Sequence, residues 1–158
     1  MDARVYIETS IVSYLSARTS RNVILAGQQQ LTRIWWRERE GYTLCTSQLV
    51  LNEASRGAAR ASKRRLGALR NVDLLQSTEA AARLTRDLIR FGALPEKAVD
   101  DAGHVAIAAT HDVDYLLTWN CRHIANAAMR GRIEQICRSS GFRPPVICTP
   151  DELPTKNR

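Results

Sequence analysis

The chain has 158 residues, close to the usual size of one domain, and its 44% hydrophobic and 25% charged residues are ordinary for a soluble globular protein. No apolar run approaches the ~20 residues needed to span a bilayer, and the N-terminal M-D-A-R-V-Y-I lacks the apolar core of a signal peptide. We therefore expect one cytoplasmic domain without a membrane anchor, which needs no disulfide or structural metal to fold.

Hydrophobic periodicity and turn residues predict strands that alternate with helices. In chain order, we expect a strand at 4–8, helices at 9–17 and 21–39, a strand at 42–46, helices at 48–55 and 58–69, a strand at 72–75, helices at 78–91 and 97–110, a strand at 115–118, a helix at about 122–139 and a last strand at 144–148. Thr9 and Ser10 are candidate caps of the first helix and Ser47 of the third, because their hydroxyls accept hydrogen bonds from free backbone amides.

This alternation predicts an α/β fold with a central, mostly parallel sheet and helices on both faces. The segment Y-L-L-T-W at 115–119 fits a strand that is buried on both sides, since it is almost continuously apolar. We expect residues 1–150 to form this domain and residues 151–158 to be a flexible C-terminal tail.

Four oxygen-bearing side chains stand near the ends of predicted strands or the starts of helices, and they are Glu8, Glu53, Asp101 and Asn120. In an open parallel sheet the carboxyl ends of the strands share one edge, and ligands bind there. Carboxylates that crowd together repel one another unless a cation joins them. The pattern therefore predicts a divalent metal site with Glu8, Glu53 and Asp101 as ligands, and chemistry on a phosphate.

Each of these residues also has a plainer explanation. Asp101 could be an acid that only stabilises the start of a helix, a role that Asp100 could fill as well. Glu8 could cap a helix and pair with an arginine, Glu53 could be a solvated helical residue, and Asn120 could be a turn residue. The specificity lies in the four residues together.

The charge of the chain is unusual, because 23 Lys and Arg residues against 16 Asp and Glu residues give a formal net charge of +7. Arginine, which outnumbers lysine, offers a planar fork suited to phosphate oxygens. A basic helix carries Arg56, Arg60, Lys63, Arg64, Arg65 and Arg70, and a second set follows with Arg122, His123, Arg130 and Arg132. These clusters predict nucleic-acid binding, although a solvated helix and a charge that only aids solubility would look the same.

The order of four motifs resembles PIN-domain nucleases, among them the VapC-like toxins of bacterial type II toxin–antitoxin modules. The motifs are Y-I-E-T-S-I-V, L-V-L-N-E, D-A-G-H-V-A-I-A-A and D-Y-L-L-T-W-N-C-R-H-I, and the resemblance covers roughly residues 4–149. By this resemblance Glu8, Glu53 and Asp101 stand at three acidic positions of the family. Asn120 stands at the fourth, where many members have Asp.

The resemblance implies a Mg²⁺- or Mn²⁺-dependent endoribonuclease with RNA as its substrate and a cognate antitoxin as its partner. Thr9 or Ser10 would match a hydroxyl residue that the family often has near the metal or phosphate. Trp35 or Trp36 is a candidate for a homodimer or antitoxin surface, since aromatic residues favour interfaces. We expect His104 to be a packed or hydrogen-bonded histidine, because Mg²⁺ prefers oxygen ligands.

Two departures from the family pattern leave an alternative open. Glu8 is longer than the usual Asp by one methylene, and Asn120 removes a negative charge. The chain could therefore be a PIN-like binding module whose metal site has weakened. Trp119, next to Asn120, is a candidate for stacking on a base or for packing in the core. No nucleotide-binding loop of the types G-x-x-x-x-G-K-[ST] or G-x-G-x-x-G occurs in the sequence.

Overall fold

The computed structural model describes residues 1–156 and builds them around a five-stranded sheet. The strands are β1 (Ala3–Ile7), β2 (Tyr42–Ser47), β3 (Asp73–Leu75), β4 (Tyr115–Leu117) and β5 (Val146–Cys148), in the order β3-β2-β1-β4-β5. Every neighbouring pair is parallel. The predicted α/β class with a parallel sheet is confirmed, and all five predicted strands are present.

The helices alternate with these strands as the sequence predicts. They are α1 (Thr9–Ser16), α2 (Val23–Arg37), α3 (Gln48–Ala54), α4 (Ala59–Ala68), α5 (Glu79–Arg90), the 3₁₀ helix η1 (Glu96–Ala98), α6 (Val99–Thr110) and α7 (Ala127–Ser139). Within the described residues, no helix is both long enough and apolar enough to cross a membrane.

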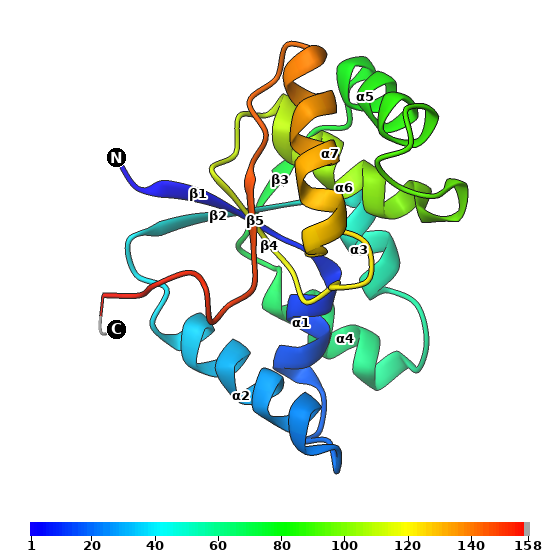
Figure 1. Ribbon diagram of the computed structural model, residues 1–158. Helices are drawn as coiled ribbons and strands as arrows, with labels where there is room; N and C mark the ends of the chain where they lie inside the picture. The colour runs from blue at the N-terminus through cyan, green and yellow to red at the C-terminus, as the bar shows by residue number, and fades with distance from the viewer. Residues whose placement is uncertain (157–158) are drawn as a thin grey trace.

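The strand order reverses its direction at the centre of the sheet. From β1 the chain adds β2 and then β3 on one side, and it later adds β4 and β5 on the other side of β1. Because connections between parallel strands are right-handed, the two halves send their helices to opposite faces. Figure 1 shows α1, α2 and α4 on one side of the sheet and α5, α6 and α7 on the other. A ligand crevice is expected where the order reverses, outside the carboxyl ends of β1 and β4.

The central strand β1 is buried over its last three residues, and its register with β4 determines which residues meet at the reversal point. Val5, Tyr6 and Ile7 are fully buried, and Ile7 pairs with Leu117. The next residue on each strand is therefore in register as well, and the backbone amide of Glu8 donates to the carbonyl of Leu117 at 3.2 Å. Glu8 and Thr118 consequently leave the sheet side by side.

Two predicted helix starts differ from those observed. The N-cap of α1 is Glu8, whose carboxylate accepts from the amide of Ser10, so neither Thr9 nor Ser10 is the cap. The helix expected from about 122 begins at Ala127, because the side chain of Asn126 caps it by accepting from the amide of Ala128. The residues between β4 and α7 form a loop in place of the predicted first helical turn.

The C-terminal segment packs against the start of the sheet up to Thr155. Leu153 and Thr155 are buried, the hydroxyl of Thr155 donates to Glu38 at 3.1 Å, and Tyr42 donates to the carbonyl of Pro154. The flexible tail that we expected at 151–158 includes these packed residues. Residues 157 and 158 lie outside the described part of the chain. Because Leu153 is buried, the C-terminal segment has a packing role that the sequence pattern did not predict.

We predict that Leu153→Ala will lower the free energy of unfolding by about 2–5 kcal/mol, because Leu153 is only 2% exposed and the substitution leaves a cavity. Leu74→Ala is the matched control, since Leu74 is 44% exposed and its truncation should cost no more than about 1 kcal/mol. Urea denaturation of both variants measures the difference. Equal, small losses would mean that the segment is loosely attached in solution.

Candidate metal and nuclease site

Glu8 lies at the reversal point of the sheet, and its buried carboxylate accepts hydrogen bonds from hydroxyls and a backbone amide. Its side chain is 5% exposed. One oxygen, Oε2, accepts from the amide of Ser10 at 2.9 Å, from the Ser10 hydroxyl, and from the hydroxyl of Thr118 at 2.8 Å. All these donors are neutral, and within the described residues no arginine or lysine forms a salt bridge with Glu8. Burial of a carboxylate in this way is costly unless a positive charge joins it.

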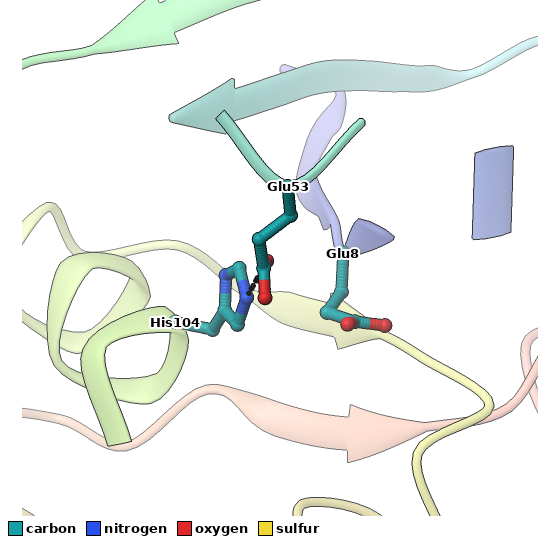
Figure 2. Close-up of side chains that lie close together, drawn as sticks. All are labelled: Glu8, Glu53 and His104. Atoms are coloured by element: carbon teal, nitrogen blue, oxygen red, sulfur yellow. Dashed lines mark hydrogen bonds and ion pairs between the residues drawn. The ribbon is translucent and has the colours of Figure 1, made fainter. Parts of the chain in front are cut away.

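Glu53 lies beside Glu8, although it comes from another element. It sits in the last turn of α3, the helix that follows β2, and its side chain is 20% exposed. Its Oε1 accepts from the hydroxyl of Thr9 at 2.7 Å and from Nε2 of His104 at 2.6 Å. Figure 2 shows that Glu8, Glu53 and His104 converge, and one potential ligand atom of each lies within 4.8 Å of the others.

A chain of buried hydrogen bonds holds His104 in place. His104 is fully buried on α6, and its Nδ1 lies 2.8 Å from the hydroxyl of Tyr6. That hydroxyl in turn lies 2.7 Å from Oγ of Ser47, the residue that caps α3. His104 is thus hydrogen-bonded on both ring nitrogens, as the sequence predicts, and its bond to Glu53 orients that carboxylate.

The pKa shifts of this pair agree with one another. Burial lowers the pKa of His104, but the hydrogen bond to Glu53 and the charges of Glu8, Glu53 and Asp101 raise it by more, so that it lies above the usual value. Burial raises the pKa of Glu53, and the hydrogen bond and charge of His104 more than offset this, so that it lies below the usual value. Both directions favour an imidazolium next to a carboxylate. Burial also raises the pKa of Tyr6, which keeps its phenol neutral.

Asp101 lies in a second cluster near the same edge. It is in the first turn of α6, with a side chain that is 20% exposed. Its Oδ1 accepts from Nδ2 of Asn120 at 3.0 Å, and its Oδ2 accepts from Nδ1 of His123 at 2.7 Å. The amide of His123 also donates to Oδ1 of Asn120 at 3.1 Å. Asn120 and His123 therefore fix the orientation of the Asp101 carboxylate.

Thr118 joins the two clusters. Its hydroxyl donates to Glu8 and accepts from the backbone amide of Asn120 at 2.9 Å. Ser10 makes a parallel link, because its hydroxyl bonds to Glu8 and accepts from the amide of Trp119 at 2.8 Å. One hydrogen-bonded network thus runs from Glu8 to Asp101 across the ends of β1 and β4.

The four residues predicted from the sequence are thus brought to one edge of the sheet, but in two groups. Glu8 and Glu53 converge directly, whereas Asp101 and Asn120 bond to each other. Asp100 is exposed, and Thr9 and Ser10 each donate to one of the glutamates. Thr118, His123 and Tyr6 are members of the network that the sequence analysis did not assign to the site.

The donor set fits a divalent cation. Two carboxylates approach closely, only one imidazole offsets their charge, and hydrogen bonds occupy a single oxygen of each. Glu8 and Glu53 therefore each keep an oxygen for a ligand, and hard oxygen donors suit Mg²⁺ or Mn²⁺. Nε2 of His104 is hydrogen-bonded to Glu53 in this arrangement, so His104 would ligate an ion at this cluster only if that bond were exchanged.

Most of the basic residues predicted to bind RNA are exposed, whereas Arg65, His123 and Arg130 are partly buried. Arg56, Arg60, Lys63, Arg64 and Arg122 are exposed. Arg65 instead turns back on its own chain, where Nε donates to the carbonyl of Ala54 at 3.0 Å and the guanidinium also reaches the carbonyl of Arg56. Arg65 therefore hydrogen-bonds to backbone carbonyls at and just after the C-terminal end of α3.

We predict that the imidazole of His104 titrates above the usual value of about 6.5 and that Glu53→Gln moves its pKa below that value, because burial then dominates. A group with a raised pKa stabilises the folded state below its unfolded pKa, and this contribution is lost as pH rises through the folded pKa. The free energy of unfolding should thus decline above about pH 6.5, and less so in Glu53→Gln. NMR titration of the ring nitrogens measures both pKa values, and equal values would contradict the ion pair.

Comparisons with known proteins support the fold. No family model matches the chain, and no curated protein matches its sequence. Among solved structures, the chain is similar to one in the crystal structure of VapBC2 from Rickettsia felis bound to a DNA fragment from their promoter. The TM-score is 0.53 at 12% identity, and the match covers 92% of this chain and 98% of the other. At this identity the likeness shows a shared fold, which is consistent with the PIN-like fold that the motifs imply.

Proposed function

We propose that this protein is a metal-dependent endoribonuclease of the PIN type and the toxin of a toxin–antitoxin module. The observation that carries the proposal is the close approach of two carboxylates, Glu8 and Glu53, at the point where the strand order reverses. Glu8 is buried with neutral partners alone, so a bound cation would remove the main electrostatic cost of the site. The fold shared with the VapBC2 chain is consistent with this activity.

Glu8, Glu53 and Asp101 would hold the Mg²⁺ or Mn²⁺ ion. When bound, such an ion polarises a phosphoryl oxygen and lowers the pKa of water, so that a phosphodiester bond can be cleaved near neutral pH. His104 holds Glu53 in place, and Asn120 and His123 hold Asp101. His104 is buried and Asn120 and His123 are half-buried, and their hydrogen bonds orient the carboxylates before substrate arrives.

The exposed basic residues would bind the RNA backbone. Arg56, Arg60, Lys63 and Arg64 lie on or just before α4, directly after the helix that carries Glu53. Phosphate contacts of this kind position a nucleic acid without reading its sequence. We assign the same role to Arg122, which follows Asn120 in the loop next to the site.

A protein partner belongs to the same proposal. The structural neighbour is named for a VapBC pair and was crystallised on promoter DNA. By this likeness we propose a cognate antitoxin for this chain, and we retain the expected homodimer and cytoplasmic location.

A non-catalytic binding module is the second candidate function, and one observation favours it. Both oxygens of Asp101 are engaged by Asn120 and His123, so Asp101 must give up or share a bond to ligate a metal directly. A module of this kind would bind RNA or protein through its basic surface and leave phosphodiester bonds intact.

We predict cleavage of small structured RNAs by the purified protein with Mn²⁺ or Mg²⁺, and none with EDTA. Asp101→Asn and Glu8→Gln should each reduce the rate by about 100-fold or more, since loss of even an outer-shell partner costs roughly 10–100-fold. The exposed neighbour provides a matched control, because Asp100→Asn should stay within about threefold of the parent. Gel analysis of end-labelled RNA measures these rates.

The same preparations separate the two candidate functions. Metal should raise the melting temperature of the parent protein, and the rise should disappear in Glu8→Gln. RNA binding without cleavage or a metal-induced shift would establish the binding module. Cleavage that persists in Asp101→Asn would refute the assignment of the site.

We predict that Arg60→Ala and Arg64→Ala weaken RNA binding and each lower the salt dependence of log Kd by about 0.7 for every phosphate that the arginine neutralises in the parent protein. Arg65→Ala should instead lower the free energy of unfolding by about 1–2 kcal/mol, because it removes the bonds to the end of α3. Fluorescence anisotropy at several salt concentrations and urea denaturation distinguish these effects. Identical behaviour of the three variants would contradict the separation of roles.

A further inference from the structure

The structure places Trp119 in the core, where it stacks on Tyr14, an aromatic residue that is only partly buried. Trp119 is only 9% exposed, and its Nε1 donates to the hydroxyl of the buried Thr32 at 2.7 Å. The indole is therefore fixed on its edge by a hydrogen bond. Tyr14 of α1 lies against one face of it, with ring centroids 6.0 Å apart and ring planes inclined by 13°.

Tyr14 is tied to the carboxylate site through short contacts. Ser10, one turn earlier on α1, bonds through its hydroxyl to Glu8 and accepts from the amide of Trp119. The Tyr14 side chain thus lies over the loop that leads from β4 to Asn120. Burial raises the pKa of Tyr14, and the nearby Cys121 and Glu8 raise it further, which keeps the phenol neutral beside the negative site.

We propose that Tyr14 is a stacking platform for an unpaired base next to the scissile phosphate, a subsite that rests on the proposed nuclease function. Trp119 occupies one face of the Tyr14 ring and Tyr14 is only partly buried, so we assign the opposite face of the ring to the base. An aromatic ring backed by a fixed indole cannot turn away, and a base that stacks on it loses little additional freedom. The exposed Arg122 follows Trp119 by three residues in the same loop and would hold the adjoining phosphate.

This subsite selects a class of substrate. A base inside a duplex has both faces covered by its neighbours, so only an unpaired base can stack on a protein ring. Stacking is tolerant of sequence because every base has a π-face. The arrangement therefore favours single-stranded RNA or the loops of structured RNA over continuous duplex, without demanding a particular base.

The test places 2-aminopurine at successive positions of a single-stranded RNA and measures its fluorescence on binding to the Asp101→Asn variant, which leaves the strand intact. We expect quenching at one position next to the cleavage site. Tyr14→Leu should abolish that quenching and weaken binding by roughly tenfold to a hundredfold. Tyr14→Phe should preserve both, because the ring and not the hydroxyl makes the contact. Phe91→Leu, which removes an exposed aromatic ring at the end of α5, is the control and should change neither.

A substrate-side experiment tests the same contact without reliance on the folding of a variant. Removing the base at the quenched position should weaken binding to the parent protein by a similar factor and leave binding to Tyr14→Leu unchanged. In the active protein, Tyr14→Leu should raise KM and leave kcat within about twofold, as expected for a contact equally strong in the ground and transition states.

The outcomes separate this subsite from the proposed function. Cleavage and quenching that are unchanged in Tyr14→Leu would overturn the subsite alone and leave the nuclease intact. Equal cleavage of duplex and single-stranded RNA would do the same. If neither the parent protein nor any variant bound RNA, the proposed function and the subsite would both be refuted.

Discussion

The candidate site depends on one constraint, the pairing of β1 with β4 at the point where the strand order reverses. That pairing brings Glu8 and Thr118 out of the sheet in register. It places a buried carboxylate at the carboxyl ends of these strands, where its hydrogen-bond donors are hydroxyls and a backbone amide and the His104 imidazole lies nearby. A buried carboxylate is stable only with strong hydrogen bonding or a positively charged ligand. Metal binding is therefore the simplest function for the carboxylates at this edge of the sheet.

The carboxylates are held by two different kinds of support. Glu53 is held by His104, with which it shares a charge-assisted bond backed by Tyr6 and Ser47 in the core. Asp101 is held at the surface of the edge by an amide and a second imidazole. The buried support is the more rigid of the two, since each of its members is fixed by packing on every side. We infer that Glu53 has one available orientation, whereas Asp101 can exchange a partner for a ligand.

Exposed basic residues follow Glu53 and Asn120 in the chain, and a partly buried tyrosine follows Glu8, a set that would suit a polyanion with exposed bases. The formal net charge is +7 and many arginines are exposed, whereas Glu8, Glu53 and Asp101 place three carboxylates at the site. A phosphodiester backbone can thus be attracted over a distance and then held next to a cation. Composition alone overestimates how many basic and aromatic residues are available to bind a nucleic acid. Arg65 and Trp119, for example, make contacts within the protein.

The sequence by itself determined the alternation of strands and helices, the parallel sheet, and the edge at which Glu8, Glu53, Asp101 and Asn120 gather, because hydrophobic period and strand-end position are local properties. Only the tertiary structure decided how these residues divide. His104 became the partner of Glu53 and His123 the partner of Asp101, since side chains distant in the chain meet according to register and helix packing. It also decided that Leu153 is buried and that Asn126 starts α7, because competition between caps and long-range burial leaves no periodic signal in the sequence.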